Sequence, residues 1–123
     1  MIESSITFLP VGDIEATTAF YTRVIGLPLW KDMGVCRIFS CTRGYWGFCQ
    51  YGDDRPIPRG VCLSLNMVST DEVDAQYARL VKAGASLLSK PEKHPNFPVY
   101  SFFVKDPDGY TVEFQKILEG GNI

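Results

Sequence analysis

Hydrophobic residues recur every three to four positions over two stretches of the chain, 13–26 and 69–84, and this spacing predicts two amphipathic helices. Asp13 is a predicted N-cap for the first helix, and Ser69 with Glu72 forms a predicted capping box for the second. Each stretch ends at a glycine, which is typical of a helix C-terminus. The residues expected to face the core are Ile14, Tyr21, Val24 and Ile25 in the first helix and Val73, Tyr77, Leu80 and Val81 in the second.

Shorter stretches of alternating apolar and polar residues lie before and after each helix and predict strands. One strand precedes each helix, and a short strand and a hairpin follow it. The segment "GYWGFCQ" at 44–50 resembles "GYTVEFQ" at 109–115, and the helices also match, so a βαβββ unit occurs twice. The main strands expected are 5–11, 35–41 and 44–50 in the first unit and 60–67, 100–106 and 109–115 in the second.

This duplication predicts an α+β fold of paired βαβββ modules within a single domain, 1–123. A stretch rich in Asp, Pro and Gly separates the two modules. The expected parts are module one at about 1–51, a linker at 52–59, module two at 60–117 and a tail at 118–123.

The charge pattern argues against two classes of partner. The net charge is −2 with a pI of about 5.3, and no segment forms a basic stripe, so we expect no nucleic-acid partner. No apolar run approaches the roughly 18 residues that a membrane span needs, and the N-terminus does not read as a signal peptide. We therefore expect a cytoplasmic protein without a membrane partner.

The four cysteines, Cys36, Cys41, Cys49 and Cys62, include no CxxC pair. Each lies in an apolar or strand-like setting, so we expect reduced thiols in the core. The single histidine, His94, lies in the proline-flanked loop "EKHPNFP" and is expected at the surface.

The opening "FLPVGDIEATTAFYTRVIGLPL" and the ending "DPDGYTVEF", together with the βαβββ pair, resemble the vicinal oxygen chelate superfamily. That superfamily includes glyoxalase I, extradiol dioxygenases, fosfomycin-resistance enzymes and bleomycin-resistance proteins. The resemblance covers nearly the whole chain. It implies a strongly curved mixed sheet that forms a cup, with the helices on its convex side, and it implies a homodimer.

The resemblance also implies where a metal would bind in metal-dependent members: on the first and the last strand of each unit. Glu113 occupies the last-strand position of the second unit, and its counterpart by the internal repeat is Phe48. The first-strand positions are Ile6 and Gly60, or Val61 if the register slips by one. One carboxylate cannot hold a divalent ion alone. We therefore expect no metal cofactor, with one divalent ion at Glu113 as the alternative.

Strand alternation suggests what lines the cup in place of an ion. The side chains expected to share its surface are mostly aromatic, with a few polar groups, which is the composition of a small-molecule pocket. A one-residue slip in register would turn Arg37 to solvent, and the aromatic residues could simply fill the cup. The expected ligand-binding residues are Phe8, Arg37, Trp46, Phe48, Gln50, Tyr100, Phe102, Glu113 and Gln115.

Three functions follow. The first is metal-independent binding or sequestration of a small, aromatic organic molecule, as in bleomycin-resistance proteins. The second is a glyoxalase-like lyase or dioxygenase, whose degenerate metal site would use Glu113, the one catalytic candidate, with His94 or Cys62. The third is a non-catalytic dimeric interaction module with a filled cup.

Overall fold

The computed structural model describes residues 1–118, and the chain forms two compact units, one from Met1 to Arg59 and the other from Gly60 onward. Each unit contains one helical segment and one mixed sheet, which confirms the α+β fold of paired βαβββ modules. That the two units act as a single domain with a shared cup stays a prediction. Apart from Leu118, the expected tail lies outside the described residues.

The first unit forms a sheet with the strand order β1-β4-β3-β2. The outer strand β1 runs parallel to β4, whereas β4, β3 and β2 are antiparallel neighbours. Its elements are β1 (Ile6–Pro10), α1 (Ile14–Ala19), η1 (Phe20–Ile25), β2 (Leu29–Asp32), β3 (Cys36–Ser40) and β4 (Tyr45–Cys49).

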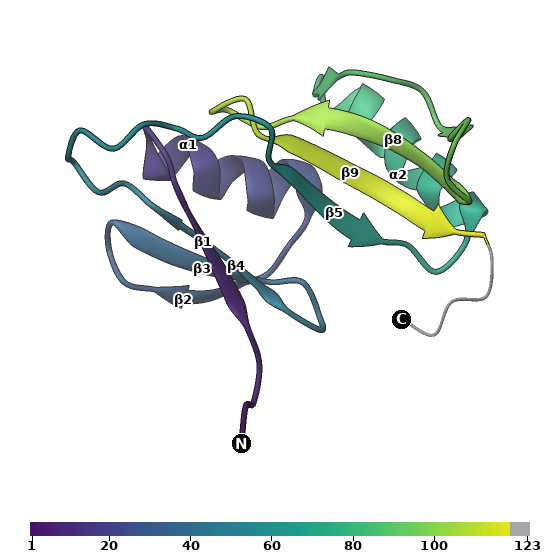
Figure 1. Cartoon of the computed structure of the whole chain (residues 1–123). Helices are drawn as coiled ribbons and strands as arrows, with labels where there is room; N and C mark the ends of the chain where they lie inside the picture. Colours follow the sequence, from purple (N-terminus) through teal and green to yellow (C-terminus); the bar gives the residue numbers. More distant parts are fainter. Residues whose placement is uncertain (119–123) are drawn as a thin grey trace. The chain divides into compact units, whose positions relative to one another are not determined.

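The second unit repeats this topology with the order β5-β9-β8-β6, and β7 pairs with a different stretch of β8 from β6. The helix α2 lies along one face of the sheet formed by β5, β9 and β8 (Figure 1). Its elements are β5 (Cys62–Asn66), α2 (Thr70–Lys82), β6 (Ser86–Leu87), β7 (Glu92–Lys93), β8 (Val99–Lys105) and β9 (Thr111–Ile117).

Both predicted N-caps are confirmed. The Asp13 carboxylate accepts hydrogen bonds from the amides of Glu15 and Ala16, and the Ser69 hydroxyl accepts one from the amide of Glu72. These bonds satisfy amides that have no partner within the helix.

The first helix differs from the regular helix expected, because its second half, η1, is a π-helix. The amides of Gly26 and Leu27 both donate to the carbonyl of Tyr21, at 3.0 and 2.8 Å. The hydroxyls of Thr18 and Thr22 also donate to carbonyls four residues earlier, a pattern that bends helices. The segment then ends at Gly26, which has a φ of 94°.

Each core lies between a sheet and its helix. Of the eight helical residues expected to face it, Val24 and Tyr77 are half-buried, and Val81 is 51% exposed, contrary to expectation. The fully or nearly fully buried ones are Ile14, Tyr21, Ile25, Val73 and Leu80.

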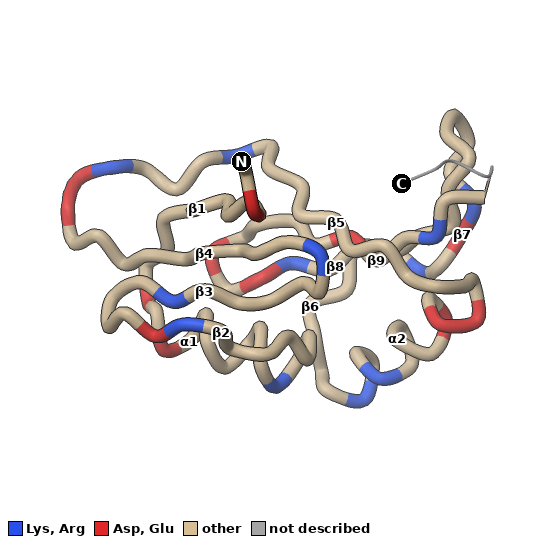
Figure 2. The backbone as a smooth tube through the Cα atoms, turned by 90° about the horizontal axis from the view of Figure 1, so that it is seen from below, with Lys and Arg blue, Asp and Glu red and all other residues tan. Residues whose placement is uncertain are grey.

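Within the described residues, no helix is long and apolar enough to cross a membrane. Lysine and arginine residues are distributed over several elements instead of gathering on one (Figure 2).

Candidate ligand-binding site

The face of the second sheet that points away from α2 carries the polar groups of the unit. Glu113 in the middle of β9 pairs in register with Ser64 of β5 on one side and Phe103 of β8 on the other. Residues paired in this way point to the same face of a sheet. Val112 and Phe114, on either side of Glu113, are therefore on the helix face, where both are buried.

A hollow of about 280 Å³ lies on this open face, entirely within the second unit. Its wall combines an apolar surface with one carboxylate, one imidazole, one amide and one thiol. The lining residues are Cys62, His94, Phe97, Val99, Phe103, Glu113 and Gln115.

Glu113 is the most buried polar group of this wall, with only 9% of the residue exposed. Ser64 donates its hydroxyl hydrogen to Oε1 at 2.5 Å, and the Cys62 Sγ lies 4.0 Å from the same oxygen. Arg37 and Arg55 pair with other carboxylates, and within residues 1–118 Glu113 forms no ion pair with a cation.

The second oxygen of Glu113, Oε2, has no hydrogen-bond partner among the described residues. Every fully buried side-chain nitrogen or oxygen of that part of the chain does have one. Oε2 is therefore not sealed in the protein and is reached from the hollow.

The loop between β7 and β8 forms the opposite wall and has a defined geometry. The amide of His94 donates to the carbonyl of Val99 at 2.9 Å, which closes the hairpin. The ring atom Nδ1 of His94 accepts from the amides of Asn96 and Phe97, at 3.0 and 3.2 Å. The centres of the His94 and Phe97 rings lie 4.8 Å apart. His94 is thus half-buried in the wall instead of exposed as expected.

Tyr100 and Phe102, expected beside Glu113, point to the helix instead. The Phe102 ring lies 5.3 Å from Tyr77 of α2, and the Tyr100 hydroxyl donates to Asp74 at 2.6 Å. The length of the turn between β8 and β9 explains why the sequence placed these two residues on the wrong face. Because Lys105 pairs with Thr111, the odd-numbered residues of β8 face the hollow, and the even-numbered ones face α2.

In the first unit, Trp46 and Phe48 also belong to the core between sheet and helix, and their expected place on the concave face is wrong. The Tyr21 ring stacks on Phe48 at 4.5 Å and meets Trp46 edge-on at 6.1 Å. Gln50 accepts the amide hydrogen of Ile14 at 2.9 Å, so it caps the helix N-terminus.

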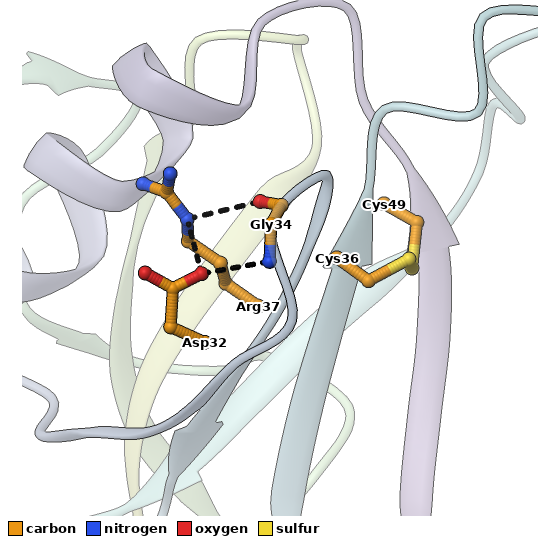
Figure 3. Close-up of a disulfide and its surroundings, with 5 residues drawn as sticks. All are labelled: Asp32, Gly34, Cys36, Arg37 and Cys49. Carbon is orange, nitrogen blue, oxygen red and sulfur yellow. Dashed lines mark hydrogen bonds and ion pairs between the residues drawn. A yellow bond between two sulfur atoms is a disulfide. The ribbon is translucent and has the colours of Figure 1, made fainter.

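Arg37 also faces the helix of its unit instead of the expected cup. Its Nη2 lies 2.6 Å from Oε1 of Glu15 on α1. Its Nε lies 3.3 Å from Oδ1 of Asp32 on β2 (Figure 3). The hydrogen bond that Arg37 donates to Glu15 raises the pKa of Arg37, and Asp32 adds to this effect. Arg37 therefore pairs within its own unit.

Phe8 and Gln115 lie on the open faces of their units. Phe8 is 44% exposed, and its ring covers Gly47 of β4, where a methyl group would overlap it. Gln115 donates its amide hydrogen to Oδ1 of Asn66 at 3.1 Å. That these residues bind a ligand stays a prediction.

Two of the four cysteines form a disulfide, which corrects the expectation of reduced thiols. Cys36 and Cys49 are opposite each other on β3 and β4, and they lie on the face away from Arg37 (Figure 3). Cys41 and Cys62 are free. Burial raises the pKa of Cys41 to about 11, whereas Cys62 is exposed instead of being a core thiol.

The strand registers correct the internal alignment by one residue. The amide of Val11, just after β1, donates to the carbonyl of Cys49 at 3.0 Å. The equivalent amide of Met67, just after β5, donates to Gln115 at 2.7 Å. Gly47 lies two residues before Cys49, and Glu113 lies two residues before Gln115. The counterpart of Glu113 is therefore Gly47 instead of Phe48.

The same comparison gives the counterpart of Ile6. Ile6 pairs with Tyr45, and Cys62 pairs with Thr111, each pair lying two residues before the positions of Gly47 and Glu113. Cys62 is therefore the corresponding residue, and neither Gly60 nor Val61 is.

These four positions do not fit an ordinary divalent metal site. Ile6 and Gly47 offer no side-chain donor, and Cys62 and Glu113 supply one sulfur and one carboxylate. Within residues 1–118 no three His, Cys, Asp or Glu side chains are grouped closely enough to hold an ion.

Comparison with known proteins assigns the fold to a family. A family model described as the Glyoxalase/Bleomycin resistance protein/Dioxygenase superfamily matches residues 5–114. A protein from Vibrio cholerae serotype O1, named "Probable lactoylglutathione lyase", is 26% identical, with 87% of this chain and 85% of that protein covered.

Solved structures give the same result. A lactoylglutathione lyase from Agrobacterium tumefaciens is similar with a TM-score of 0.77 and 26% identity, covering 97% of each chain. A glyoxalase/bleomycin resistance protein/dioxygenase from Nocardioides is similar with a TM-score of 0.78 and 24% identity, covering 98% of this chain and 87% of that one.

Proposed function

The chain belongs to the Glyoxalase/Bleomycin resistance protein/Dioxygenase superfamily, and we propose that it binds a small, planar organic molecule at Glu113 without a metal ion. One observation carries the proposal. Glu113 is a nine-tenths buried carboxylate, and within the described residues its hydrogen-bond partners are hydroxyl and thiol groups instead of a cation. A buried charge is costly unless something pairs with it, and a bound ligand supplies that partner.

The rest of the wall suits an aromatic ligand. Phe97 is 60% exposed, and Phe103 is half-buried beside Glu113 in the register of the sheet. Aromatic side chains with free faces favour stacking on another ring. A hollow of about 280 Å³ is at the small end for such sites.

Thermal unfolding of the purified protein with a panel of flat aromatic amines and amides tests the proposal. A ligand at about 100 times its Kd should raise the free energy of unfolding by about 2.7 kcal/mol, and a chelator should not reduce this gain. The variant Glu113→Gln should weaken binding by about tenfold or more. Glu92→Gln removes an exposed carboxylate of the same unit outside the lining and should leave binding unchanged.

Loss of the stabilisation on adding a chelator would contradict metal-independent binding. A panel that shifts no melting curve would leave the interaction module as the remaining function, with the homodimer predicted from the sequence as its assembly.

A lyase is the second candidate, because relatives at 26% identity carry the name lactoylglutathione lyase. On this alternative Glu113 would hold a divalent ion, which would act as the electrophile. The four positions where metal-dependent members bind the ion argue against a bound ion here, because only Cys62 and Glu113 have donor side chains. Formation of lactoylglutathione by the protein incubated with zinc or nickel, and its loss in Glu113→Gln, would favour the lyase over the binding protein.

A further inference from the structure

The polar groups of the hollow include two strong acceptors, Glu113 and Gln115, and one ring donor, His94. Glu113 offers carboxylate oxygens, which accept hydrogen bonds when ionised. Gln115 donates one of its two amide hydrogens to Asn66 at 3.1 Å, and its carbonyl oxygen is a further acceptor.

His94 is the donor, because the loop fixes which ring nitrogen carries the hydrogen. Its Nδ1 accepts two backbone amide hydrogens, from Asn96 and Phe97, so it carries none itself. In the neutral ring the hydrogen is then on Nε2. The polar atom that the His94 ring has left to offer a ligand is therefore an N–H group.

The apolar groups determine the shape of a ligand that could lie between Glu113, Gln115 and His94. Phe97 and Phe103 supply aromatic surface, and Val99 supplies an aliphatic one, all within the same wall. The carboxylate comes from β9 of the sheet, the imidazole comes from the loop between β7 and β8, and both line the hollow.

We infer that the ligand is a planar heterocycle with a lactam or equivalent edge, in which an N–H donor for Glu113 is adjacent to an acceptor for His94. This inference rests on the proposed binding function and specifies its ligand class. A carboxylate-bearing ligand would face Glu113 with like charge, and a purely hydrocarbon ring would leave both polar groups without partners.

A set of bicyclic probes of one shape tests the inference. The lactam 2-quinolinone has the adjacent donor and acceptor, N-methyl-2-quinolinone lacks the donor, and naphthalene lacks both. Calorimetric titration should show that 2-quinolinone binds about tenfold or more tightly than either analogue. In Glu113→Gln we expect the preference of 2-quinolinone over N-methyl-2-quinolinone to fall, because a neutral amide accepts the N–H more weakly than a carboxylate.

The variant His94→Asn tests the donor. The Asn side chain can still accept the loop amides from Asn96 and Phe97, as short amides do in turns, but it is too short to reproduce the ring N–H. We expect 2-quinolinone to lose about tenfold in affinity and naphthalene to be unaffected. Circular dichroism of the variant checks that the fold is kept.

The outcomes separate the two levels of the proposal. If all three probes bind with equal affinity in both the parent protein and Glu113→Gln, the ligand class is wrong and binding of flat molecules stands. If none of them binds at up to about 1 mM and the broader panel of amines and amides also fails, the binding function itself is wrong.

Discussion

The two free thiols have different surroundings at the scale of single residues. Cys62 is exposed at the edge of the hollow, whereas Cys41 is half-buried, and burial raises its pKa to about 11. The thiolate is the reactive form, so access and pKa together set the rate of alkylation.

We expect iodoacetamide at pH 8 to alkylate Cys62 at least about tenfold faster than Cys41, because a thiol with this raised pKa is only about one part in a thousand thiolate at that pH. Peptide mass spectrometry at successive times measures both rates. In guanidinium chloride the two rates should become similar. Equal rates in the folded protein would contradict the burial of Cys41.

Sequence reasoning located Glu113 but missed most of its neighbours. The pattern "DPDGYTVEF" marks the carboxylate locally, whereas His94, Phe97 and Phe103 reach the hollow through the pairing of β8 with β7 and β9. The residues of the disulfide, Cys36 and Cys49, are likewise joined by strand pairing and carry no local signal.

At the scale of elements, the close contact between β1 and β4 depends on a glycine. Gly47 lies beneath the ring of Phe8, its register partner on the neighbouring strand. A Cβ at Gly47 would overlap that ring.

We expect Gly47→Ala to lower the free energy of unfolding by about 1–3 kcal/mol, the usual range for overpacking. Because Phe8 is the nearest obstacle, the same substitution in a Phe8→Ala background should cost at least about 1 kcal/mol less. Urea denaturation of the four proteins of this double-mutant cycle measures the difference. Additive effects would show that the ring is not what excludes the side chain.

Helix boundaries and strand faces were predictable to different degrees. Asp13 and Ser69 act through amides two or three residues away, so the sequence alone predicted both caps. Which residues of a strand face the helix depends on the length of the turn that joins it to the next strand. Matching Gly44 and Tyr45 to Gly109 and Tyr110 by letter misaligned the last strands by one residue, because Tyr45 lies inside β4, whereas Tyr110 precedes β9. A slip of one residue exchanges the two faces of a strand.

At the scale of the whole molecule, the chain divides into two units that share a topology and differ in what stabilises them. The disulfide and both tryptophans, Trp30 and Trp46, belong to the first unit, whereas the long helix α2 belongs to the second. Fluorescence therefore reports on the first unit, whereas the helical circular dichroism signal comes from both units.

Reduction of the disulfide tests the single domain that the sequence predicts. The bond spans 13 residues, and a loop of this size restricts the unfolded chain by about 3 kcal/mol. We expect a reductant to lower the free energy of unfolding by about this amount. In one cooperative domain, the fluorescence and circular dichroism transitions in urea should move together.

A double variant with Cys36→Ser and Cys49→Ser is the control, since its transitions should not respond to the reductant, and Cys62→Ser should respond like the parent. If reduction shifts the fluorescence transition but only part of the circular dichroism transition, α2 and its sheet unfold independently and the chain has two domains. Coincident transitions would mean that loss of a bond in the first unit destabilises the hollow around Glu113 in the second, so that a ligand bound there would stabilise both units together.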